Sequence, residues 1–383
     1  MTLADGADGA DGNGQAAPAP ASYAAAGVDV VAGERAVDLM RTSVAAATRP
    51  EVLDGFGGFA GLFDLSIAKE YQRPVLATST DGVGTKVAIA RALDRHDTIG
   101  RDLVAMIVDD IVVTGAEPLF LTDYIATGRV EPERIAAIVS GIAAGCAEAG
   151  VALIGGETAE HPGLMAPDEY DLAGAATGIV EADLRLGPHL VKPGDVLVGL
   201  GASGLHSNGY SLARAVLHRD DPAALAEVVP ALGRTIGEEL LEPTRIYTRL
   251  CLSLARSNIG VHAMSHVTGG GLAANVGRVL PQGLIAVISR ATWAPLPIFS
   301  LIAERGNISR LEMETAFNMG IGMVVVAEPA SLTGIFEQAA QAGVPAVAMG
   351  EVRVQQQGDQ GDAPAKGGTG GIAMLTGDYP TAG

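Results

Sequence analysis

The sequence predicts a mixed α/β (α+β) protein made of two domains. Three observations support this: the 383 residues exceed the usual size of one domain, 48% of them are apolar, and strand-like and helix-like segments alternate along the chain. A turn-rich stretch near 183–194, RLGPHLVKPGD, combines proline and glycine before a new strand. It separates an N-terminal domain, 23–187, from a C-terminal domain, 188–383.

The predicted elements follow the hydrophobic pattern of the chain. An acidic stretch, 1–22, lacks the basic and apolar regions of a signal peptide and is predicted to be a disordered tail. The low-complexity segment 355–371, QQQGDQGDAPAKGGTGG, is predicted to loop out as an insertion before the last strand. The predicted strands are 75–79, 119–127, 151–155, 171–180, 195–201, 261–266, 284–289, 321–327, 344–350 and 372–376. The predicted helices are 34–47, 85–94, 98–114, 132–149, 208–218, 234–255, 270–279, 298–305 and 329–341.

The composition excludes several classes of protein. A formal charge of −19 argues against nucleic-acid and anionic-membrane partners, and no apolar run is long enough to predict a membrane span. Cys146 and Cys251 lie far apart in helix-like segments, which favours buried thiols in a reducing cytoplasm over a disulfide or a zinc site. An anionic substrate must therefore be held by glycine loops, helix N-termini, a few basic residues or a metal ion.

The stretch VLATSTDGVGTKVAIA, 75–90, follows an apolar run with an acid, two glycines and a lysine. Glycines let backbone N–H groups approach an anion closely, and a lysine adds a positive charge. The Walker A pattern GxxxxGK[ST] is absent. The stretch therefore predicts phosphate or metal chemistry, without naming a reaction, at Asp81, Gly82, Gly84, Thr85 and Lys86.

An acidic residue lies on the apolar side of the predicted helix 98–114. At 100° per residue, Asp110 shares a stripe with the apolar residues Leu103, Met106, Ile107 and Val113. A carboxylate in that apolar position destabilises the folded protein unless it is paired with another group or bound to a metal ion. A partly solvated helix edge is the alternative. Asp109 lies on the flank with Asp102 and is expected to be exposed.

Glu157 follows a predicted strand and two glycines in VALIGGETAEHPG. Ligands of α/β folds gather at such strand ends, and a solvated loop residue is the alternative. Together, Asp81, Asp110 and Glu157 make an oxygen-only set of the kind that Mg²⁺ prefers.

The segment GLGASGLHSNGYS, 199–211, contains the pattern GxGxxG after a strand, with Asp220 and Asp221 about 20 residues further on, as in dinucleotide-binding proteins. That fingerprint needs its glycines to open the helix, whereas here the helix is expected to begin after them, near Ser207 or Asn208. His206, Ser207 and Asn208 instead form a polar cluster at a helix N-terminus, where a phosphate can bind. A structural role is the alternative for His206.

Three further glycine-rich stretches accompany these. In SHVTGGGLAANV, 265–276, Thr268 and three glycines precede a helix, which suits an anion and a tight turn equally well. FGGFAG, 56–61, is predicted to be a flexible loop. FNMGIGMVVV, 317–326, predicts either a bulged strand or a close approach of the backbone to a ligand.

Taken in order, these segments resemble one family, phosphoribosylformylglycinamidine cyclo-ligase, also called aminoimidazole ribonucleotide synthetase. Ten collinear motifs between about residue 23 and 350 carry the resemblance: YAAAGVDVVAGERAV, RPEVLDGFGGFAGLFDL, TDGVGTKVAIA, HDTIGRDLVAM, VVTGAEPLFLTDYIATG, LIGGETAEHPG, GASGLHSNGYSL, EPTRIY, HVTGGGL and FNMGIGM. The resemblance therefore covers nearly the whole of the predicted folded chain.

The resemblance implies a ligase of purine biosynthesis that uses ATP and Mg²⁺. Formylglycinamidine ribonucleotide and ATP would give aminoimidazole ribonucleotide, ADP and phosphate: ATP activates the formyl oxygen, and the substrate's own nitrogen then displaces phosphate. It also implies a cytoplasmic homodimer in which the N-terminal, ATP-binding domains pair into a barrel-like sheet, with the active site in a cleft. Such chemistry needs charge neutralisation and phosphate positioning more than a protein nucleophile.

Carried over residue by residue, the resemblance assigns roles to the residues singled out above. It implies catalytic roles for His206, Asp110 and Lys86, and metal binding by Asp81, Asp110 and Glu157. The residues expected to contact ATP or the substrate are Asp81, Gly82, Gly84, Thr85, Lys86, Asn208, Thr268, Gly269 and Gly270.

The sequence departs from the family pattern at three positions. Asp109 stands where an asparagine often precedes the helix aspartate, Arg41 where a lysine is expected, and Met165 where a tyrosine is common. Three other protein families share the ATP-binding scaffold and offer alternative functions: thiamine-monophosphate kinase, selenophosphate synthetase and the hydrogenase-maturation protein. The last two often carry a reactive cysteine that this chain lacks. An NAD-dependent oxidoreductase and a non-catalytic nucleotide-binding protein are the alternatives from other classes.

Overall fold

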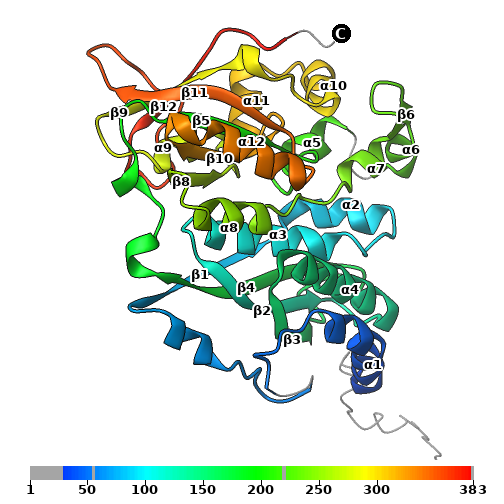
Figure 1. Ribbon diagram of the computed structural model, residues 1–383. Coiled ribbons are helices and arrows are strands. Elements are labelled where there is room, and N and C mark those ends of the chain that lie inside the picture. The colour runs from blue at the N-terminus through cyan, green and yellow to red at the C-terminus, as the bar shows by residue number, and fades with distance from the viewer. Residues whose placement is uncertain (1–28, 54–56, 218–220, 381–383) are drawn as a thin grey trace, which may run out of the picture.

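The computed structural model describes residues 29–53, 57–217 and 221–380, and it contains two main sheets that lie one above the other in Figure 1. The N-terminal half holds a four-stranded sheet of order β1-β4-β2-β3, and the C-terminal half a six-stranded sheet of order β12-β9-β11-β5-β10-β8. The prediction of a mixed α/β protein with two sheet-containing halves is confirmed. The predicted tail, 1–22, lies outside the described residues.

The N-terminal sheet is covered by helices on one face only. Helices α3 and α4 pack against this face, and α4 connects the parallel strands β2 and β3. On the other face, side chains such as Leu76 and Tyr124 are 59% and 41% exposed. The strands are β1 (Pro74–Gly82), β2 (Glu117–Thr127), β3 (Ala152–Glu160) and β4 (Tyr170–Glu181), and the helices are α1 (Val30–Ala46), α2 (Val87–Ala92), α3 (Ile99–Val112) and α4 (Pro132–Ala149).

The C-terminal sheet is covered on both faces, so its central strands β5 and β10 are buried almost throughout. Leu272 and Val276 of α9 belong to the apolar cluster of one face, and Leu254 of α8 and Ile335 of α12 to the cluster of the other. The strands are β5 (Val196–Gly201), β8 (Val261–His266), β9 (Leu284–Ser289), β10 (Ile321–Ala327), β11 (Ala346–Val354) and β12 (Ile372–Thr376), with a separate short pair β6 (Val228–Val229) and β7 (Arg234–Thr235). The helices are α5 (Tyr210–Val216), α6 (Pro222–Leu225), α7 (Ile236–Leu240), α8 (Thr248–Arg256), α9 (Gly271–Arg278), α10 (Pro297–Gly306), α11 (Arg310–Ala316) and α12 (Leu332–Gln341).

Each predicted strand overlaps an observed one, but the structure corrects or refines three other expectations. The single helix predicted over 234–255 is wrong: Pro243, which has no N–H, lies between α7 and α8. The short elements β6, β7, α6 and α11 were not predicted. The segment 355–371 is a largely exposed loop without helix or strand, as predicted, but it does not project freely: Gly371 N–H donates to the carbonyl of Leu280 (2.9 Å), and Ala365 lies close to Gly277 of α9.

Other expectations agree with the structure. Cys146 and Cys251 are free and buried. Strand β10 has a bulge between Ile321 and Met323, as one of the two readings of FNMGIGMVVV predicted. Within the described ranges, no helix combines the length and apolar character needed to cross a membrane.

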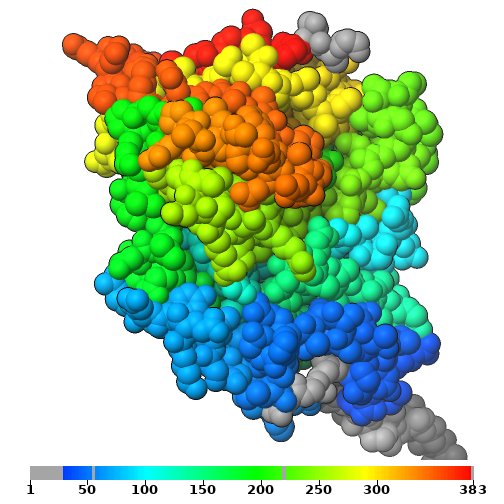
Figure 2. All heavy atoms as spheres, in the orientation of Figure 1, coloured from blue at the N-terminus to red at the C-terminus, as the bar shows by residue number. Residues whose placement is uncertain are grey.

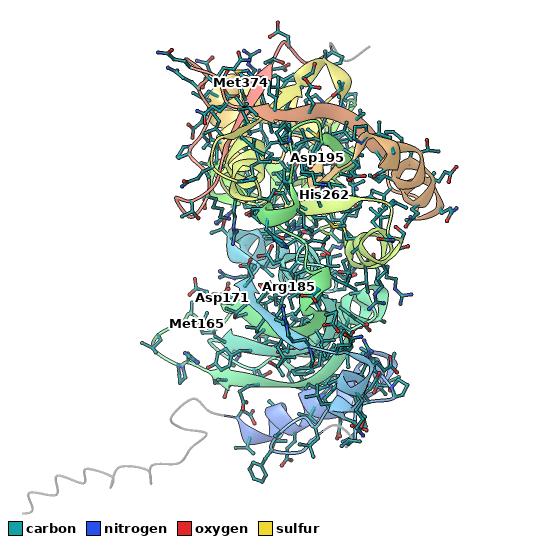
Figure 3. All side chains as sticks on the ribbon, turned by 60° about the vertical axis from the view of Figure 1, so that its left-hand side comes forward. Met165, Asp171, Arg185, Asp195, His262 and Met374 are labelled. Atoms are coloured by element: carbon teal, nitrogen blue, oxygen red, sulfur yellow. The ribbon has the colours of Figure 1, made fainter. Side chains whose placement is uncertain are left out.

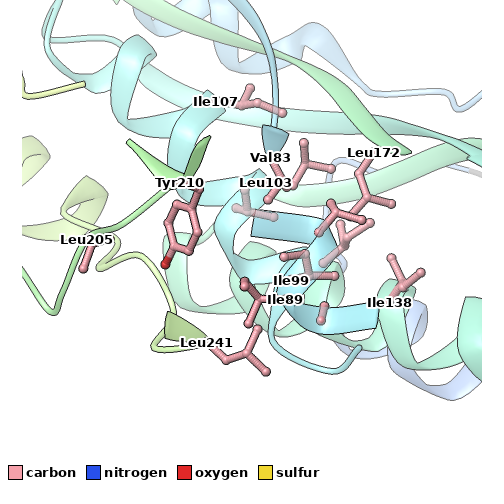
Figure 4. Close-up of a cluster of buried hydrophobic side chains, with 14 of the residues drawn as sticks. Val83, Ile89, Ile99, Leu103, Ile107, Ile138, Leu172, Leu205, Tyr210 and Leu241 are labelled. Carbon is pink, nitrogen blue, oxygen red and sulfur yellow. The ribbon is translucent and has the colours of Figure 1, made fainter. Parts of the chain in front are cut away.

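A continuous apolar core joins the two halves. In Figure 4, Tyr210 of the C-terminal half lies beside Leu103 of the N-terminal half, and Leu205, Leu241 and Val83 are buried in the same cluster. The space-filling view shows the blue and cyan N-terminal half and the yellow and orange C-terminal half packed into one body (Figure 2). Burial of this shared surface resists separation of the halves.

A fully buried ion pair lies inside this interface. Lys86 Nζ donates to Asp102 Oδ1 (2.8 Å), to the carbonyl of His206 (3.2 Å) and to the carbonyl of Glu242 (2.6 Å). Asp102 in turn accepts from the backbone N–H and the hydroxyl of Thr244 (2.8 and 2.6 Å). Both charged side chains are inaccessible to water. The ammonium therefore uses its three N–H groups to tie α3 to two segments of the C-terminal half.

A second buried carboxylate connects α3 to the start of α8. Asp109 accepts from the backbone N–H of Tyr247 (3.0 Å) and from the hydroxyl of Thr248 (2.8 Å). Burial raises the pKa of Asp109 to about 6, although the charge of His266 and these two hydrogen bonds oppose the increase. The expectation that Asp109 is exposed is wrong, because the flank of α3 that it shares with Asp102 faces the other domain rather than solvent.

Replacing Lys86 should unfold the protein more readily. Lys86→Ala leaves the buried Asp102 carboxylate without its cation, a change that costs about 3–5 kcal/mol of unfolding free energy. Lys192→Ala, which removes an exposed ion pair with Glu328, is the control and should cost no more than about 1 kcal/mol. Urea unfolding measures both. A Lys86→Ala variant that is as stable as the wild type but has lost turnover would show that Lys86 acts on ligand.

Asp109→Asn should change how stability depends on pH. The pKa of Asp109 is about 6 in the folded protein and near 3.9 in the unfolded chain, so between these values the folded state holds a proton that the unfolded state has lost. The unfolding free energy of the wild type should therefore fall by up to about 3 kcal/mol between pH 4 and pH 7 because of Asp109. Asparagine has no such proton, so the stability of the variant relative to wild type should rise from pH 4 to pH 7. Parallel pH profiles of unfolding free energy would contradict this.

Candidate active site

The predicted site residues that the structure brings together lie where the two domains meet. Asp81 is near the end of β1, Asp110 is in the last turn of α3, and His266 ends β8. His266 Nδ1 lies 2.9 Å from Asp110 Oδ1; the His266 side chain is 2% exposed and that of Asp110 is 37% exposed. A cavity of about 230 Å³ opens beside them, lined among others by Asp110, His266, Thr268, Asn275 and Arg278. Whole-ligand pockets usually measure about 300–1,000 Å³, so this one suits part of a ligand.

The charges of these groups are coupled. Burial raises the pKa of Asp81, and the negative charge of Asp110 raises it further. Burial would also raise the pKa of Asp110, but the hydrogen bond and charge of His266 lower it below its ordinary value. Burial alone would lower the pKa of His266, but the hydrogen bond to Asp110 and the nearby carboxylates raise it. The site therefore favours an imidazolium–carboxylate pair next to a second carboxylate.

The glycine turn Thr268–Gly271 forms one wall of the site. The backbone N–H of Gly269 donates to Asn208 Oδ1 (2.9 Å), and Asn275 Nδ2 donates to the carbonyls of Thr268 (3.1 Å) and Gly271 (2.8 Å). Gly270 and Gly271 have φ values of +98° and +71°, and a Cβ on Gly271 would overlap the carbonyl oxygen of Glu314. The turn is thus fixed from both sides, and it opens α9 with Thr268 lining the cavity.

Asn208 was predicted to contact ligand, and the structure gives it a different contact. Its side-chain oxygen holds the glycine turn, so it acts on the site through Gly269. On the other side, the turn Gly84–Lys86 that follows β1 is linked to α5, since the hydroxyls of Thr85 and Ser211 lie 3.2 Å apart. Gly82, Gly84 and Thr85 retain at least partial exposure at the end of β1.

His206 does not reach a cleft. It is only 1% exposed, and its ring lies against Gly322, where an added Cβ would overlap both the His206 ring and the Tyr247 hydroxyl. Burial, reinforced by the charges of His266 and Lys86, pushes the pKa of His206 well below its ordinary value. The structure therefore favours a structural role for His206 over the catalytic role that the resemblance implied. Its φ of +63° and its Nδ1, which is buried with no hydrogen-bond partner, mark it as a strained residue behind the site.

The geometry also argues against a phosphate-binding or catalytic role for Lys86. Its three protein acceptors leave the ammonium no N–H for a phosphate, and no part of the side chain is accessible. The lysine next to the two glycines therefore stabilises the domain interface that carries Asp110 and His266.

Glu157 is not brought together with the other two carboxylates within one chain. Across the sheet, Glu157 in β3 is paired with Tyr124, Tyr124 with Ala173, and Ala173 with Gly82 in β1. Three strand spacings of about 4.8 Å place it about 14 Å from the end of β1. Glu157 is exposed and lines a different cavity, with Asp123 and residues of α1. Over the described part of the chain, no cluster of three metal-binding side chains forms.

The dinucleotide alternative does not fit the structure. Gly199 and Gly201 lie in β5, and α5 begins at Tyr210, so the glycines do not open the helix. One of the two acids expected for that motif, Asp220, lies outside the described residues.

The three departures from the family pattern do not line the cavity beside Asp110. Asp109 is at the domain interface, Arg41 is an exposed residue of α1 that pairs with Asp38, and Met165 lies in the connection between β3 and β4. Figure 3 shows Met165 at the edge of the N-terminal half, whereas Asp195 and His262, a hydrogen-bonded pair 2.8 Å apart, lie in the C-terminal half.

Two residues near the cavity were not predicted. His266 lies two residues before Thr268 in SHVTGGGL. Its position in this glycine-rich motif was the sequence signal that could have identified it as a site residue. Lys366 Nζ donates to the hydroxyl of Thr268 (2.8 Å) from the low-complexity segment, where no periodic pattern could point to it.

Solved structures with the same fold include ATP-using proteins. A thiamine-monophosphate kinase from Stenotrophomonas maltophilia has a TM-score of 0.63 at 20% identity, and covers 90% of this chain and 97% of its own. The hydrogenase maturation protein HypE in complex with ATP has a TM-score of 0.58 at 15% identity, and covers 84% of this chain and 86% of its own. At these identities the likeness shows a shared fold.

Sequence comparison is more specific. Family models described as the N-terminal and C-terminal domains of AIR synthase related protein match residues 64–180 and 192–359. The phosphoribosylformylglycinamidine cyclo-ligase of Geobacillus kaustophilus is 52% identical over 331 residues, 86% of this chain and 95% of that protein. The one from Acetivibrio thermocellus is 50% identical over 339 residues, 88% of this chain and 98% of that protein. The chain therefore belongs to the phosphoribosylformylglycinamidine cyclo-ligase family.

Proposed function

We propose that this protein is a ligase that uses ATP to close the imidazole ring of formylglycinamidine ribonucleotide, giving 5-aminoimidazole ribonucleotide, ADP and phosphate in purine biosynthesis. The observation that carries the proposal is the match to named cyclo-ligases over at least 95% of their length. The site agrees with it, since Asp110, His266 and Thr268 of the glycine turn line one cavity at the domain interface, and Asp81 lies close enough to Asp110 to interact with its charge.

The reaction asks the protein to neutralise charge rather than to form a covalent bond. The formyl oxygen of the substrate attacks the γ-phosphate of ATP, and ADP leaves. The substrate's ring-forming nitrogen then attacks the activated carbon, phosphate leaves with the oxygen, and a proton is lost. Backbone N–H groups at the start of α9 and the unpartnered Nε2 of His266 are the donors placed to hold phosphate oxygens.

The residues present fit a magnesium ion. Asp81 and Asp110 supply oxygen ligands of the kind that Mg²⁺ prefers. The negative charge of Asp110 raises the pKa of Asp81, and a cation between them would relieve this repulsion. When bound, Mg²⁺ would offset the charge of the ATP phosphates.

We also propose that the protein works as a homodimer and that Glu157 joins the site through it. The N-terminal sheet has one uncovered face and two unpaired edge strands, β1 with Asp81 and β3 with Glu157. Two such sheets that close into the expected barrel would pair β3 of one subunit with β1 of the other. Glu157 would then lie beside the partner's β1, which would provide the third carboxylate that one chain lacks.

An ADP-release assay with formylglycinamidine ribonucleotide tests the reaction and the role of Asp110. The wild type should release ADP only when ATP, Mg²⁺ and this ribonucleotide are all present. Asp110→Asn keeps the shape and removes a charge, so turnover should fall on the order of 10²-fold while the protein stays folded. Asp97→Asn, an exposed carboxylate just before α3, is the control. ADP release without the ribonucleotide would contradict the function, and full activity of Asp110→Asn would contradict the role of Asp110.

Mixed dimers test whether Glu157 acts on the partner's site. Asp81→Asn and Glu157→Gln homodimers should both be nearly inactive. A heterodimer of the two, purified through two different tags, contains one intact site of two and should recover about half of the wild-type activity. A heterodimer of Asp81→Asn with Asp110→Asn is the control and should stay inactive, since these residues act within one chain. An inactive Asp81→Asn/Glu157→Gln heterodimer would refute the shared site.

A further inference from the structure

The low-complexity segment 355–371 is anchored at Asp359 and Asp362. At its start, Arg353 forms a two-fold ion pair with Asp359 (2.7 and 2.9 Å). Further along, Asp362 N–H donates to the carbonyl of Ala373 (3.0 Å), and the N–H of Leu375 donates to Asp362 Oδ2 (2.6 Å). Charge-assisted hydrogen bonds of this kind hold a glycine-rich segment in one place despite its weak conformational preference.

The middle of the segment lies on α9, the helix that the glycine turn opens. The backbone N–H of Lys366 donates to the carbonyl of Ala274 (2.9 Å), and Ala365 packs close to Gly277. From this position the Lys366 side chain extends to Thr268, where Nζ donates to the hydroxyl at 2.8 Å. Thr268 is 9% exposed and lines the cavity, so the ammonium lies at the rim of the site.

The ammonium of Lys366 acts on both carboxylates of the site. It lies close enough to Asp81 and Asp110 for its positive charge to act on both. The chain has four lysines. Lys86 is fully occupied inside the interface, and Lys69 and Lys192 lie on other elements, whereas Lys366 is hydrogen-bonded to Thr268 of the cavity wall.

A separate observation indicates that this cavity takes a ligand with hydrogen-bonding oxygens. His266 Nε2 is buried and has no hydrogen-bond partner among the described residues, although its other ring nitrogen is paired with Asp110. A buried imidazole nitrogen without a partner is costly, and a ligand oxygen would satisfy it. The cavity wall also carries Arg278 at the end of α9, and Lys366 is hydrogen-bonded to Thr268 of the same wall.

We propose that Lys366 is a phosphate-binding residue of this enzyme, which holds a phosphate group of ATP or of the ribonucleotide against the glycine turn Thr268–Gly271. Thr268 positions the ammonium, and α9 adds its N-terminal N–H groups. The family's C-terminal model matches only as far as residue 359, so the segment that carries Lys366 lies beyond the matched part. The identity of the phosphate as that of ATP or of the substrate rests on the proposed function; the phosphate site itself does not.

Steady-state kinetics of Lys366→Ala distinguish the two sources of phosphate. Loss of a charge-assisted hydrogen bond should raise one KM about tenfold, with kcat changed much less. A higher KM for the ribonucleotide assigns Lys366 to its phosphate monoester, and a higher KM for ATP assigns it to the polyphosphate. Lys366→Arg should restore most of the loss. Lys192→Ala, which removes the same charge elsewhere on the C-terminal half, should leave both KM values unchanged. Unchanged KM values in Lys366→Ala would overturn the proposal.

A binding measurement keeps the result independent of turnover. Inorganic phosphate is titrated into wild type and Lys366→Ala, followed by phosphorus-31 NMR, and melting temperatures are compared on the same preparations. Weaker phosphate binding by Lys366→Ala at an unchanged melting temperature supports the proposal, even if the wild type fails to turn over formylglycinamidine ribonucleotide. Equal phosphate affinities, or no binding by the wild type, would overturn it.

Discussion

The architecture depends on one ammonium group that never meets water. Lys86 satisfies its three N–H groups with Asp102 of α3 and with carbonyls of His206 and Glu242, which belong to the other half of the chain. A buried charge is tolerated only when such partners are in place, so the pair permits few relative positions of the two halves. The same helix α3 presents Asp110 to His266 about two turns further along. The buried ion pair therefore helps to fix the geometry of the Asp110–His266 pair.

The sequence predicted the strands and helices of the fold better than it predicted which polar side chains are buried. Runs such as VHAMSH and LIAVIS correspond to β8 and β9 at the predicted bounds, because a strand buried on both faces leaves a local apolar signature. Asp110 was recognised from its place on an apolar stripe. Lys86 and His206 were assigned to ligand, although both are buried, because burial of a polar side chain depends on segments distant in sequence, here near residues 242 and 322. Glu157 was grouped with Asp81 and Asp110 because linear order does not reveal how many strands separate them.

An acidic protein that binds anionic ligands must concentrate its positive charge locally. The formal charge is −19, yet the cavity is lined by Arg278 and by a histidine whose pKa is raised by the hydrogen bond to Asp110, and Lys366 is hydrogen-bonded to Thr268 of the cavity wall. Backbone N–H groups of the glycine turn add partial positive charge without a side chain. This local arrangement explains how a chain whose net negative charge repels polyanions can hold phosphates at one place. It also explains how the segment 355–371, which has little sequence pattern, can contribute a positive charge to the site.

The central claim is that the buried contacts make the two halves one cooperative unit with the site at their junction. Native-state hydrogen exchange at low denaturant tests it directly, by comparing amides of β1 and α3 with amides of β8 and β10. The account predicts that both sets exchange through a common opening, with the same free energy and the same dependence on denaturant. Exchange of the β8 and β10 amides under conditions in which β1 and α3 stay protected would show that the halves open separately, and would contradict it.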